Sequence, residues 1–166
     1  MKVGLFIGRF QPLHRGHLLI MKKLAPRTGR FIVGLGSTNI GPSCENPFAV
    51  EERREMVVKV MKEIGIRHFK IVELPDFARD EEWVRVVRRT VGDFDIAWSG
   101  DPWVIRVFKA QGLPIEQIKE FPGYSATKIR RRMVQGLPWL KYIPLSTRKY
   151  LREIGAVKRV RTLCRP

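Results

Sequence analysis

One loop, Gly8–His17, constrains this chain more than any other part of it. The loop reads GRFQPLHRGH and follows Val3–Ile7, an apolar run short enough to be a strand buried on both faces. The next residues, Leu18–Leu24, have the length and composition of a helix. Strand-to-helix loops of open α/β sheets bind phosphates, because free N–H groups and the helix dipole favour anions. The two imidazoles and two guanidinium groups of this loop therefore suit phosphate chemistry.

The length of 166 residues favours a single domain with one sizeable core. We divide it into an α/β core over 1–136 and a helical C-terminal extension over 137–166. No apolar run approaches the roughly 20 residues that a membrane span needs. The N-terminus passes straight into a strand, without a signal peptide. We therefore expect a cytoplasmic protein.

The two cysteines, Cys44 and Cys164, have neither metal-ligand spacing nor the framework of a disulfide-rich domain. We expect two unremarkable thiols in a reducing compartment.

The formal charge of +16 is large, because 32 lysines and arginines face only 16 acidic residues. Such a balance suits nucleic acid, an anionic membrane surface, or polyanionic small substrates such as ATP. The bases are spread along the chain, with denser groups at 128–132 and 158–161. Composition alone does not choose among these three partners.

Apolar runs alternate with helical patterns along most of the chain, which predicts an α/β fold. We expect a doubly wound, parallel five-stranded sheet, Rossmann-like, in the order 3-2-1-4-5, with a small helical C-terminal region. The predicted N-caps of four helices are Asp80, Asp101, Ser125 and Ser146. The predicted strands cover 3–7, 31–36, 69–74, 94–98 and 115–121, and the predicted helices cover 18–24, 49–64, 81–90, 102–111, 126–135 and 147–154. We expect a basic tail after Gly155.

This strand order predicts where a ligand binds. The topological switch point falls between the first and fourth strands, at their C-terminal ends. The Arg9–His17 loop and the turn Ser99-Gly100-Asp101 would then face each other across one crevice. The helix that begins after Ser125 would point its N-terminus into the same crevice.

His14 and His17 stand three residues apart near a helix start, and Gly16 between them permits a close backbone approach. Nucleotidyl transfer needs positive donors aimed at oxygens that gain charge in the transition state. The two histidines and Arg9 could supply such donors without a covalent nucleophile. The alternatives are exposed loop histidines or a metal site, but a third metal ligand is missing nearby.

Ser125-Ala126-Thr127-Lys128-Ile129-Arg130 is a second constellation. Ser125 and Thr127 lie in the first turn of a predicted helix, where hydroxyls and free N–H groups hold phosphates. Arg130 lies one turn further on. The alternative is an ordinary N-cap followed by a solvated basic face.

Both strings resemble known motifs. Gly8–His17 resembles the HxGH region of the nucleotidyltransferase superfamily, and Ser125–Arg130 resembles its later S-x-T-x-x-R motif. Nearly the whole chain is similar to the archaeal nicotinamide-nucleotide adenylyltransferase family, including Glu45–Phe48 and the turn at Ser99-Gly100.

The resemblance implies an enzyme of NAD biosynthesis that transfers AMP from ATP to NMN and releases pyrophosphate. It implies Mg²⁺ carried by the triphosphate and water, no metal site in the protein, and a homo-oligomer, a hexamer by analogy. The implied catalytic residues are Arg9, His14, His17 and Arg130. The implied ATP and phosphate ligands are Gly8, Arg9, Phe10, His14, Gly16, His17, Ser125, Thr127 and Arg130.

The resemblance also implies that Asp80, Trp83, Ser99, Gly100 and Asp101 bind NMN. Trp83 would lie near the nicotinamide ring in a cation–π contact, and its alternative is a core aromatic. Asp80 and Asp101 stand where the family has asparagine, and a carboxylate only accepts hydrogen bonds. Another acceptor, nicotinate nucleotide or phosphopantetheine, therefore stays open. A nucleic-acid-binding protein ranks last, because no RNA-binding module motif is present.

Overall fold

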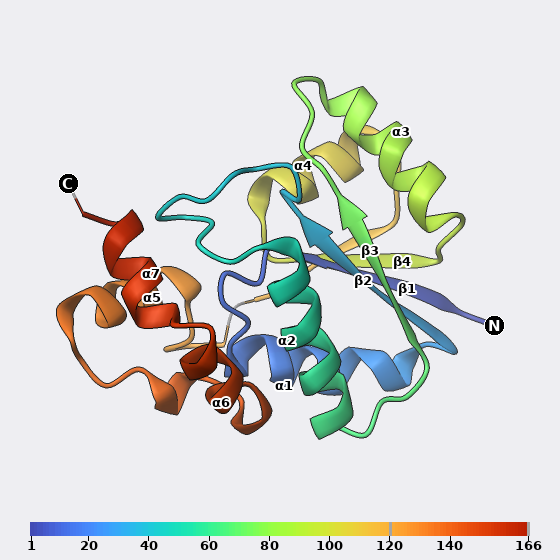
Figure 1. Ribbon diagram of the computed structural model, residues 1–166. Coiled ribbons are helices and arrows are strands. Elements are labelled where there is room, and N and C mark those ends of the chain that lie inside the picture. The colour runs from blue at the N-terminus through green and yellow to red at the C-terminus, as the bar shows by residue number, and fades with distance from the viewer. Residues whose placement is uncertain (120, 166) are drawn as a thin grey trace. The chain divides into compact units, whose positions relative to one another are not determined.

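The computed structural model describes residues 1–119 and 121–165. Five parallel strands form one sheet in the order β3-β2-β1-β4-β5 (Figure 1). This order and the Rossmann-like α/β class confirm the prediction. The strands are β1 (Val3–Gly8), β2 (Arg30–Gly36), β3 (Phe69–Leu74), β4 (Ile96–Ser99) and β5 (Ile115–Gln117).

Helices connect the strands and make up the C-terminal part of the described chain. They are α1 (Arg15–Leu24), α2 (Val50–Glu63), α3 (Asp80–Val91), α4 (Pro102–Ala110), α5 (Ala126–Gln135), α6 (Leu145–Glu153) and α7 (Ala156–Leu163). Two short 3₁₀ turns, η1 (Ala25–Arg27) and η2 (Leu140–Tyr142), complete the set.

The chain forms two compact units, each assembled from three segments. Unit 1 comprises residues 1–9, 23–40 and 68–119, and it holds the sheet with α3 and α4. Unit 2 comprises residues 10–22, 41–67 and 120–166, and it holds most of α1 together with α2 and α5 to α7. The expected single domain with a boundary after residue 136 stays a prediction.

Unit 1 has a core between the sheet and the helices α3 and α4. Leu5 and Ile7 of β1 and Ile32 of β2 belong to it, as do Trp83 of α3 and Phe108 of α4. Phe6 lies between Leu5 and Ile7 and is equally buried, although alternate strand residues point to opposite faces. The strand is thus buried on both faces, as its unbroken apolar run predicts.

Unit 2 has a helical core. Val57, Val60 and Met61 on the apolar face of α2 are fully buried, as the helical spacing predicts. Helix α2 packs on α6, and α5 packs on α7. Ile129 of α5 and Val160 of α7 are buried as well.

Two of the four predicted N-caps are confirmed. The Asp101 carboxylate accepts a hydrogen bond from the Trp103 N–H at 2.9 Å, and the Ser125 hydroxyl accepts one from the Lys128 N–H at 3.5 Å. Both side chains thus satisfy N–H groups that a helix start leaves without intrahelical partners.

The other two predicted N-caps are wrong. Asp80 is the first residue of α3, after Arg79 as N-cap, and its carboxylate makes contacts to α4 instead. Ser146 lies inside α6, and its N–H donates to the carboxylate of Glu63 at 2.9 Å. In both places a tertiary partner replaces the local cap, and one sequence window does not reveal such a partner.

Two further expectations need correction. β5 ends at Gln117 rather than at residue 121, and Glu120 of the predicted strand lies outside the described residues. The segment after Gly155 was expected to be a basic tail, but residues 156–163 form α7. Gly155 adopts φ 65°, a left-handed conformation that lets one helix end and the next begin.

The two cysteines form a disulfide, which contradicts the expectation of two thiols. Cys44 and Cys164 are joined by an S–S bond of 2.01 Å across a sequence separation of 120. Neither cysteine has a sequence neighbour that signals the pairing. Only the fold of unit 2 brings the loop before α2 next to the end of α7.

Loss of this disulfide should destabilise the protein. The bridge closes a long loop, so its removal should release chain entropy worth about 4–5 kcal/mol in the unfolded state. We expect the double variant Cys44→Ser/Cys164→Ser to unfold at lower denaturant concentration than the oxidised wild type. Reduced wild type should match the variant. Equal midpoints for all three samples would show that the bridge does not contribute.

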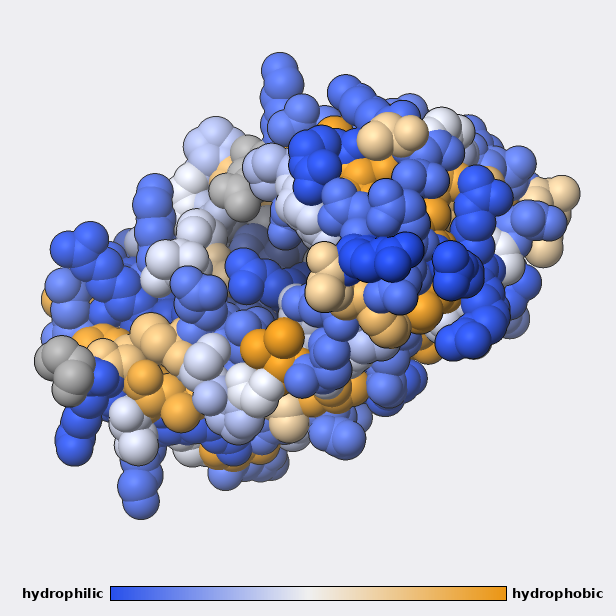
Figure 2. All heavy atoms as spheres, turned by 90° about the horizontal axis from the view of Figure 1, so that it is seen from above, coloured by the Kyte–Doolittle hydropathy of each residue, from blue (hydrophilic) through white to orange (hydrophobic). Residues whose placement is uncertain are grey.

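The surface agrees with the composition. The face drawn in Figure 2 is mostly hydrophilic, and its apolar residues form small separate patches. Among the described residues, no helix is both long and apolar enough to cross a bilayer.

Candidate functional site

The loop after β1 has an unusual backbone at Phe10. Its φ of 54° lies in the left-handed region, which few residues other than glycine adopt. The side chain is 1% exposed and meets His17 edge-on, with ring centroids 4.9 Å apart. Packing therefore holds a conformation that costs energy locally, as is common at functional sites.

His14 and His17 hold each other through reciprocal hydrogen bonds. The backbone N–H of His14 donates to Nδ1 of His17 at 3.2 Å, and the N–H of His17 donates to Nδ1 of His14 at 3.4 Å. The rings stack with centroids 3.7 Å apart. Because both Nδ1 atoms accept, each neutral ring carries its proton on Nε2. Both rings are thereby fixed as Nε2–H donors.

Burial keeps both rings neutral. Desolvation lowers the pKa of His14 to about 4. The pKa of His17 lies well below its usual value, first because of burial and second because His14 is close. At neutral pH the pair therefore acts through N–H dipoles and not as a pair of cations.

Gly16 is required by close packing. A Cβ at this position would lie 2.9 Å from Cβ of Tyr124 and 3.0 Å from the ring of His14. The ring of Tyr124 is nearly parallel to that of His14, with centroids 6.4 Å apart. The sequence did not predict this contact of Tyr124. An aromatic residue directly before the N-cap Ser125 was the available signal.

The structure brings the two motifs together through Arg130 of α5. Its Nη1 donates to the carbonyl oxygen of Gln11 at 2.7 Å, and its Nη2 donates to the hydroxyl of Thr127 at 3.4 Å. Arg130 is 7% exposed, so the guanidinium lies beneath the loop. The start of α5, capped by Ser125, is thereby fixed to the loop of the histidine pair.

Gln11 extends this network to the start of α2. Its side-chain amide donates to the carbonyl of Phe48 and accepts from the Phe48 N–H, both at 2.9 Å. Gln11 is buried, so this pair of bonds satisfies its amide.

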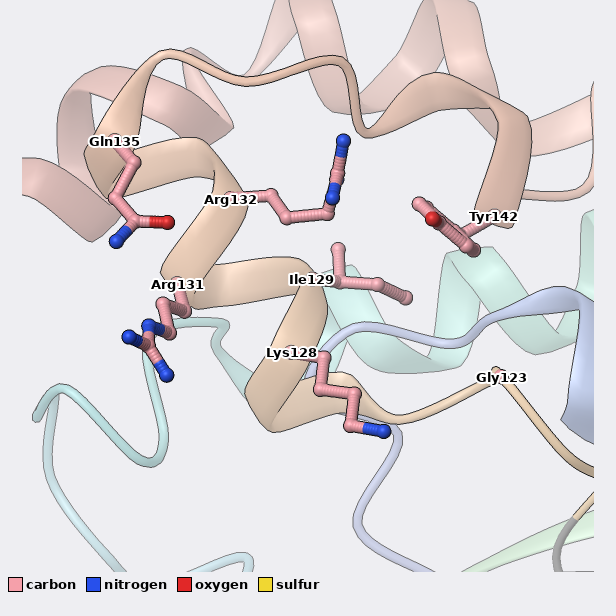
Figure 3. A pocket seen from close by; sticks show the side chains of 7 residues that line it. All are labelled: Gly123, Lys128, Ile129, Arg131, Arg132, Gln135 and Tyr142. Carbon is pink, nitrogen blue, oxygen red and sulfur yellow. The ribbon is translucent and has the colours of Figure 1, made fainter.

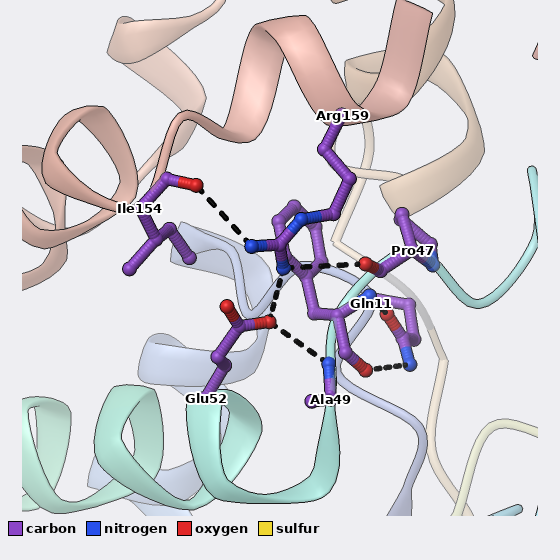
Figure 4. A network of polar contacts seen from close by, with 7 residues as sticks. Gln11, Pro47, Ala49, Glu52, Ile154 and Arg159 are labelled. Atoms are coloured by element: carbon purple, nitrogen blue, oxygen red, sulfur yellow. Dashed lines mark hydrogen bonds and ion pairs between the residues drawn. The ribbon is translucent and has the colours of Figure 1, made fainter. Parts of the chain in front are cut away.

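Arg159 of α7 also binds the segment that precedes α2 (Figure 4). Its guanidinium donates to the carbonyls of Pro47 at 3.5 Å and Ile154 at 3.3 Å, and it pairs with Glu52. The Glu52 carboxylate also accepts from the Ala49 N–H at 2.9 Å. No local sequence pattern predicted this role of Arg159, because Pro47 and Glu52 lie more than 100 residues away along the chain.

In unit 1 the ends of β1 and β4 form the predicted switch point. Ile7 pairs with Ser99, and the Ser99 hydroxyl donates to the Ile7 carbonyl at 3.3 Å. The N–H of Asp101 donates to the same hydroxyl at 3.1 Å, which fixes the turn through Gly100. Gly8 ends β1 and Arg9 follows it with an exposed side chain.

Trp103 connects Asp80 and Asp101. Asp101 caps its N–H, and Asp80 accepts from its indole N–H at 3.2 Å. Arg106 also forms an ion pair with Asp80 at 3.1 Å. Both carboxylates thus have partners on α4.

Trp83 occupies the core of unit 1 in this structure. It is 2% exposed and packs against Trp103 and Phe108, with ring centroids 4.6 and 5.6 Å away. Its buried indole nitrogen has no hydrogen-bond partner within the described part of the chain. Trp83 is thus a core aromatic residue in this structure, which is the alternative considered above. Its expected contact with a nicotinamide ring stays a prediction.

The predicted site residues thus form two groups. Unit 2 brings together Phe10, His14, Gly16, His17, Ser125, Thr127 and Arg130. Unit 1 holds Gly8, Arg9, Asp80, Trp83, Ser99, Gly100 and Asp101 at or near its strand ends and helix starts. That both groups face one crevice stays a prediction.

Comparison with known proteins places the chain in a family. A family model described as cytidylyltransferase-like matches residues 5–132. The nicotinamide-nucleotide adenylyltransferase of Pyrococcus furiosus is 35% identical over 98% of this chain and 89% of its own length. That of Archaeoglobus fulgidus is 36% identical over 95% of both chains. This chain belongs to the nicotinamide-nucleotide adenylyltransferase family.

The adenylyltransferase fold also matches a solved structure. A bifunctional NMN adenylyltransferase/ADP ribose pyrophosphatase from Francisella tularensis superimposes with a TM-score of 0.82 at 22% identity. The match covers 98% of this chain and 51% of that longer protein. At this identity the likeness concerns the fold alone.

The described residues contain no group of three or more His, Cys, Asp or Glu side chains placed to hold a metal ion.

The desolvated pair His14–His17 makes stability depend on pH. Because their pKa values are lowered in the folded chain, only the unfolded chain binds their protons as the pH falls below 6.5. The stabilisation is present above pH 6.5 and is lost toward pH 4, by about 3 kcal/mol for His14 alone. Urea unfolding between pH 7.5 and 4.5 measures this loss.

The double variant His14→Gln/His17→Gln should show a shallower loss of stability with acid than the wild type. His68 is exposed, so His68→Gln is the matched control and should retain the wild-type slope. Identical slopes for all three proteins would contradict burial of neutral histidines.

Arg159 should matter for the loop although it lies outside both motifs. Arg159→Met removes the bonds to Pro47, Ile154 and Glu52 and leaves the half-buried Glu52 carboxylate without its cation. We expect a loss of about 2–4 kcal/mol in unfolding free energy. Lys158→Met, at the exposed neighbouring position, should change stability by less than about 0.5 kcal/mol. Similar effects of both variants would contradict this assignment.

Proposed function

We propose that this chain catalyses nicotinamide-nucleotide adenylyl transfer, in which ATP and NMN give NAD and pyrophosphate. Curated relatives of this name match almost the entire chain at about 35% identity. The observation that carries the proposal is the stacked, neutral pair His14–His17, fixed to the start of α5 by Arg130.

The reaction needs positioning and charge stabilisation rather than a protein nucleophile. An NMN phosphate oxygen attacks the α-phosphorus of ATP, a new P–O bond forms, and the bond to the β-phosphate oxygen breaks. The leaving pyrophosphate takes the electron pair of that bond. Groups that donate hydrogen bonds to the developing charge lower the barrier.

The histidine pair suits this task. His14 and His17 would donate from Nε2–H to the ATP phosphates, since their Nδ1 atoms accept backbone N–H groups. Neutral donors held rigidly in place need no reorganisation during the reaction. Gly8, Phe10 and Gly16 would shape the loop around the phosphates, and Arg9 would add a guanidinium.

The start of α5 would hold the same phosphates. Ser125 and Thr127 lie in the first turn, where helix N–H groups and the dipole favour anions. Arg130 would contribute positive charge while holding the loop through Gln11. Magnesium would arrive with ATP as part of the substrate.

The NMN side would be formed by Asp80, Trp83, Ser99, Gly100 and Asp101. Both aspartates have partners in α4, so the two substitutions are consistent with a structural task at Trp103 and Arg106. Their carboxylates disfavour an anionic nicotinate ring more than a neutral carboxamide. We therefore favour NMN over nicotinate nucleotide as acceptor.

Two finer assignments belong to the same proposal. We assign the enzyme to the cytoplasm, and we expect a homo-oligomer with a hexamer as the state suggested by the family resemblance. Light scattering coupled to size exclusion measures the state directly, and a monomeric mass would reject it.

Activity should depend on the histidine pair. We expect wild-type protein with ATP, NMN and Mg²⁺ to form NAD and pyrophosphate, and His17→Ala to lose at least about 100-fold in kcat. His68→Ala, at an exposed position, should keep the wild-type rate. Normal turnover by His17→Ala would refute the mechanism.

The acceptor can be identified with the same assay. We expect pyrophosphate release with NMN to exceed that with nicotinate nucleotide, and none with phosphopantetheine. If pyrophosphate were released only with phosphopantetheine, the enzyme would still be an adenylyltransferase, but NMN would not be its acceptor. Asp80→Asn should keep the hydrogen bond to Trp103 but lose the ion pair with Arg106, which makes it the variant of choice for testing acceptor preference.

A further inference from the structure

A basic pocket lies along α5, and the proposed reaction uses none of the side chains that line it. The cavity has a volume of about 290 Å³. We call this cavity the α5 basic pocket. It is lined by Gly123, Lys128, Ile129, Arg131, Arg132, Gln135 and Tyr142 (Figure 3). Three of these described residues are cations and none is acidic.

Helical spacing places the polar residues of this pocket along one face of α5, although Lys128 and Ile129 also belong to the Ser125–Arg130 motif. Lys128, Arg131, Arg132 and Gln135 are at positions i, i+3, i+4 and i+7, which share one face of a helix. Arg130 points elsewhere, since it is buried against the carbonyl of Gln11. The pocket cations therefore do not belong to the group formed by the histidine pair and Arg130.

Part of the pocket is held in place without a ligand. Arg132 Nε donates to the Pro138 carbonyl at 2.6 Å, and its guanidinium lies over the ring of Tyr142, 5.3 Å from the centroid. Figure 3 shows Lys128 and Arg132 extending from α5 toward Tyr142 and the turn at Gly123. A cation that is already ordered loses less conformational entropy when an anion binds.

The chemistry of the lining selects the ligand. We propose that the α5 basic pocket binds a polyphosphate group, either as inorganic polyphosphate or as part of a nucleoside triphosphate. Adjacent cations, in a lining whose described residues include no carboxylate, suit linked phosphates, whose charges are closely spaced. The inference is independent of the reaction proposed above.

A single-stranded nucleic acid fits the pocket less well. Such ligands stack their bases on aromatic rings beside a basic groove. Here two cations engage the ring of Tyr142, Arg132 at 5.3 Å and Lys141 at 5.2 Å from its centroid. The ring therefore supports cations rather than offering a free face to a base.

The test measures binding without catalysis. We would titrate inorganic tripolyphosphate into the full chain at low salt and follow binding by calorimetry. The chain carries His14→Ala and His17→Ala, so that the loop of the histidine pair contributes least to the measured affinity. We expect binding to persist in this background. Adding Lys128→Gln and Arg132→Gln should weaken it at least tenfold, whereas Arg88→Gln with Arg89→Gln, an equal charge change at exposed positions of α3, should not.

Further arms separate the alternatives. Arg132→Lys should retain most binding, which distinguishes loss of charge from loss of folding, and thermal unfolding verifies each variant. ATP that binds no tighter than tripolyphosphate would identify the phosphates as the recognised group. Three results would overturn the proposal. Tripolyphosphate could fail to bind the His14→Ala/His17→Ala protein, or the Arg88→Gln/Arg89→Gln control could weaken binding as much as the pocket variant. The third is a single-stranded oligonucleotide that binds more tightly than tripolyphosphate through Lys128 and Arg132. None of these results depends on whether NAD is formed.

Discussion

The hydrogen bond from Arg130 to the carbonyl oxygen of Gln11 is the interaction on which the candidate site depends. At 2.7 Å it joins two motifs that lie 119 residues apart. A buried guanidinium is tolerated only where its donors have partners, and Gln11 and Thr127 supply them. The arginine thereby fixes the start of α5 to the loop that carries the histidine pair.

The histidine pair illustrates how packing sets chemistry. Reciprocal N–H bonds to Nδ1 fix both tautomers, and burial makes a charged ring unfavourable. Gly16 is small enough for Tyr124 to approach the ring of His14. The result is a rigid pair of neutral donors in a strongly basic chain, where permanent charge is supplied by arginine and lysine instead.

Contacts far from the motif support the same loop. Gln11 binds Phe48, Arg159 binds Pro47 and Glu52, and the disulfide ties Cys44 to Cys164. The last helix is therefore part of the support of the candidate site. The prediction of a basic tail was wrong, because residues 156–163 form α7. The fold supplies Arg159 of this helix with carbonyl and carboxylate partners.

The sequence by itself determined the strand order, the switch point and both motifs. Buried strands, helices and local motifs each produce a pattern that can be recognised within a short stretch of sequence. It also predicted the caps Asp101 and Ser125, whose partners lie within three residues. Only the tertiary structure decided the disulfide, the contacts of Asp80 with α4 and the role of Arg159. The contacts Asp80–Trp103 and Arg159–Glu52 and the disulfide span between 23 and 120 residues, so no local sequence pattern predicts them. Pairings of this kind exist only once the chain has folded.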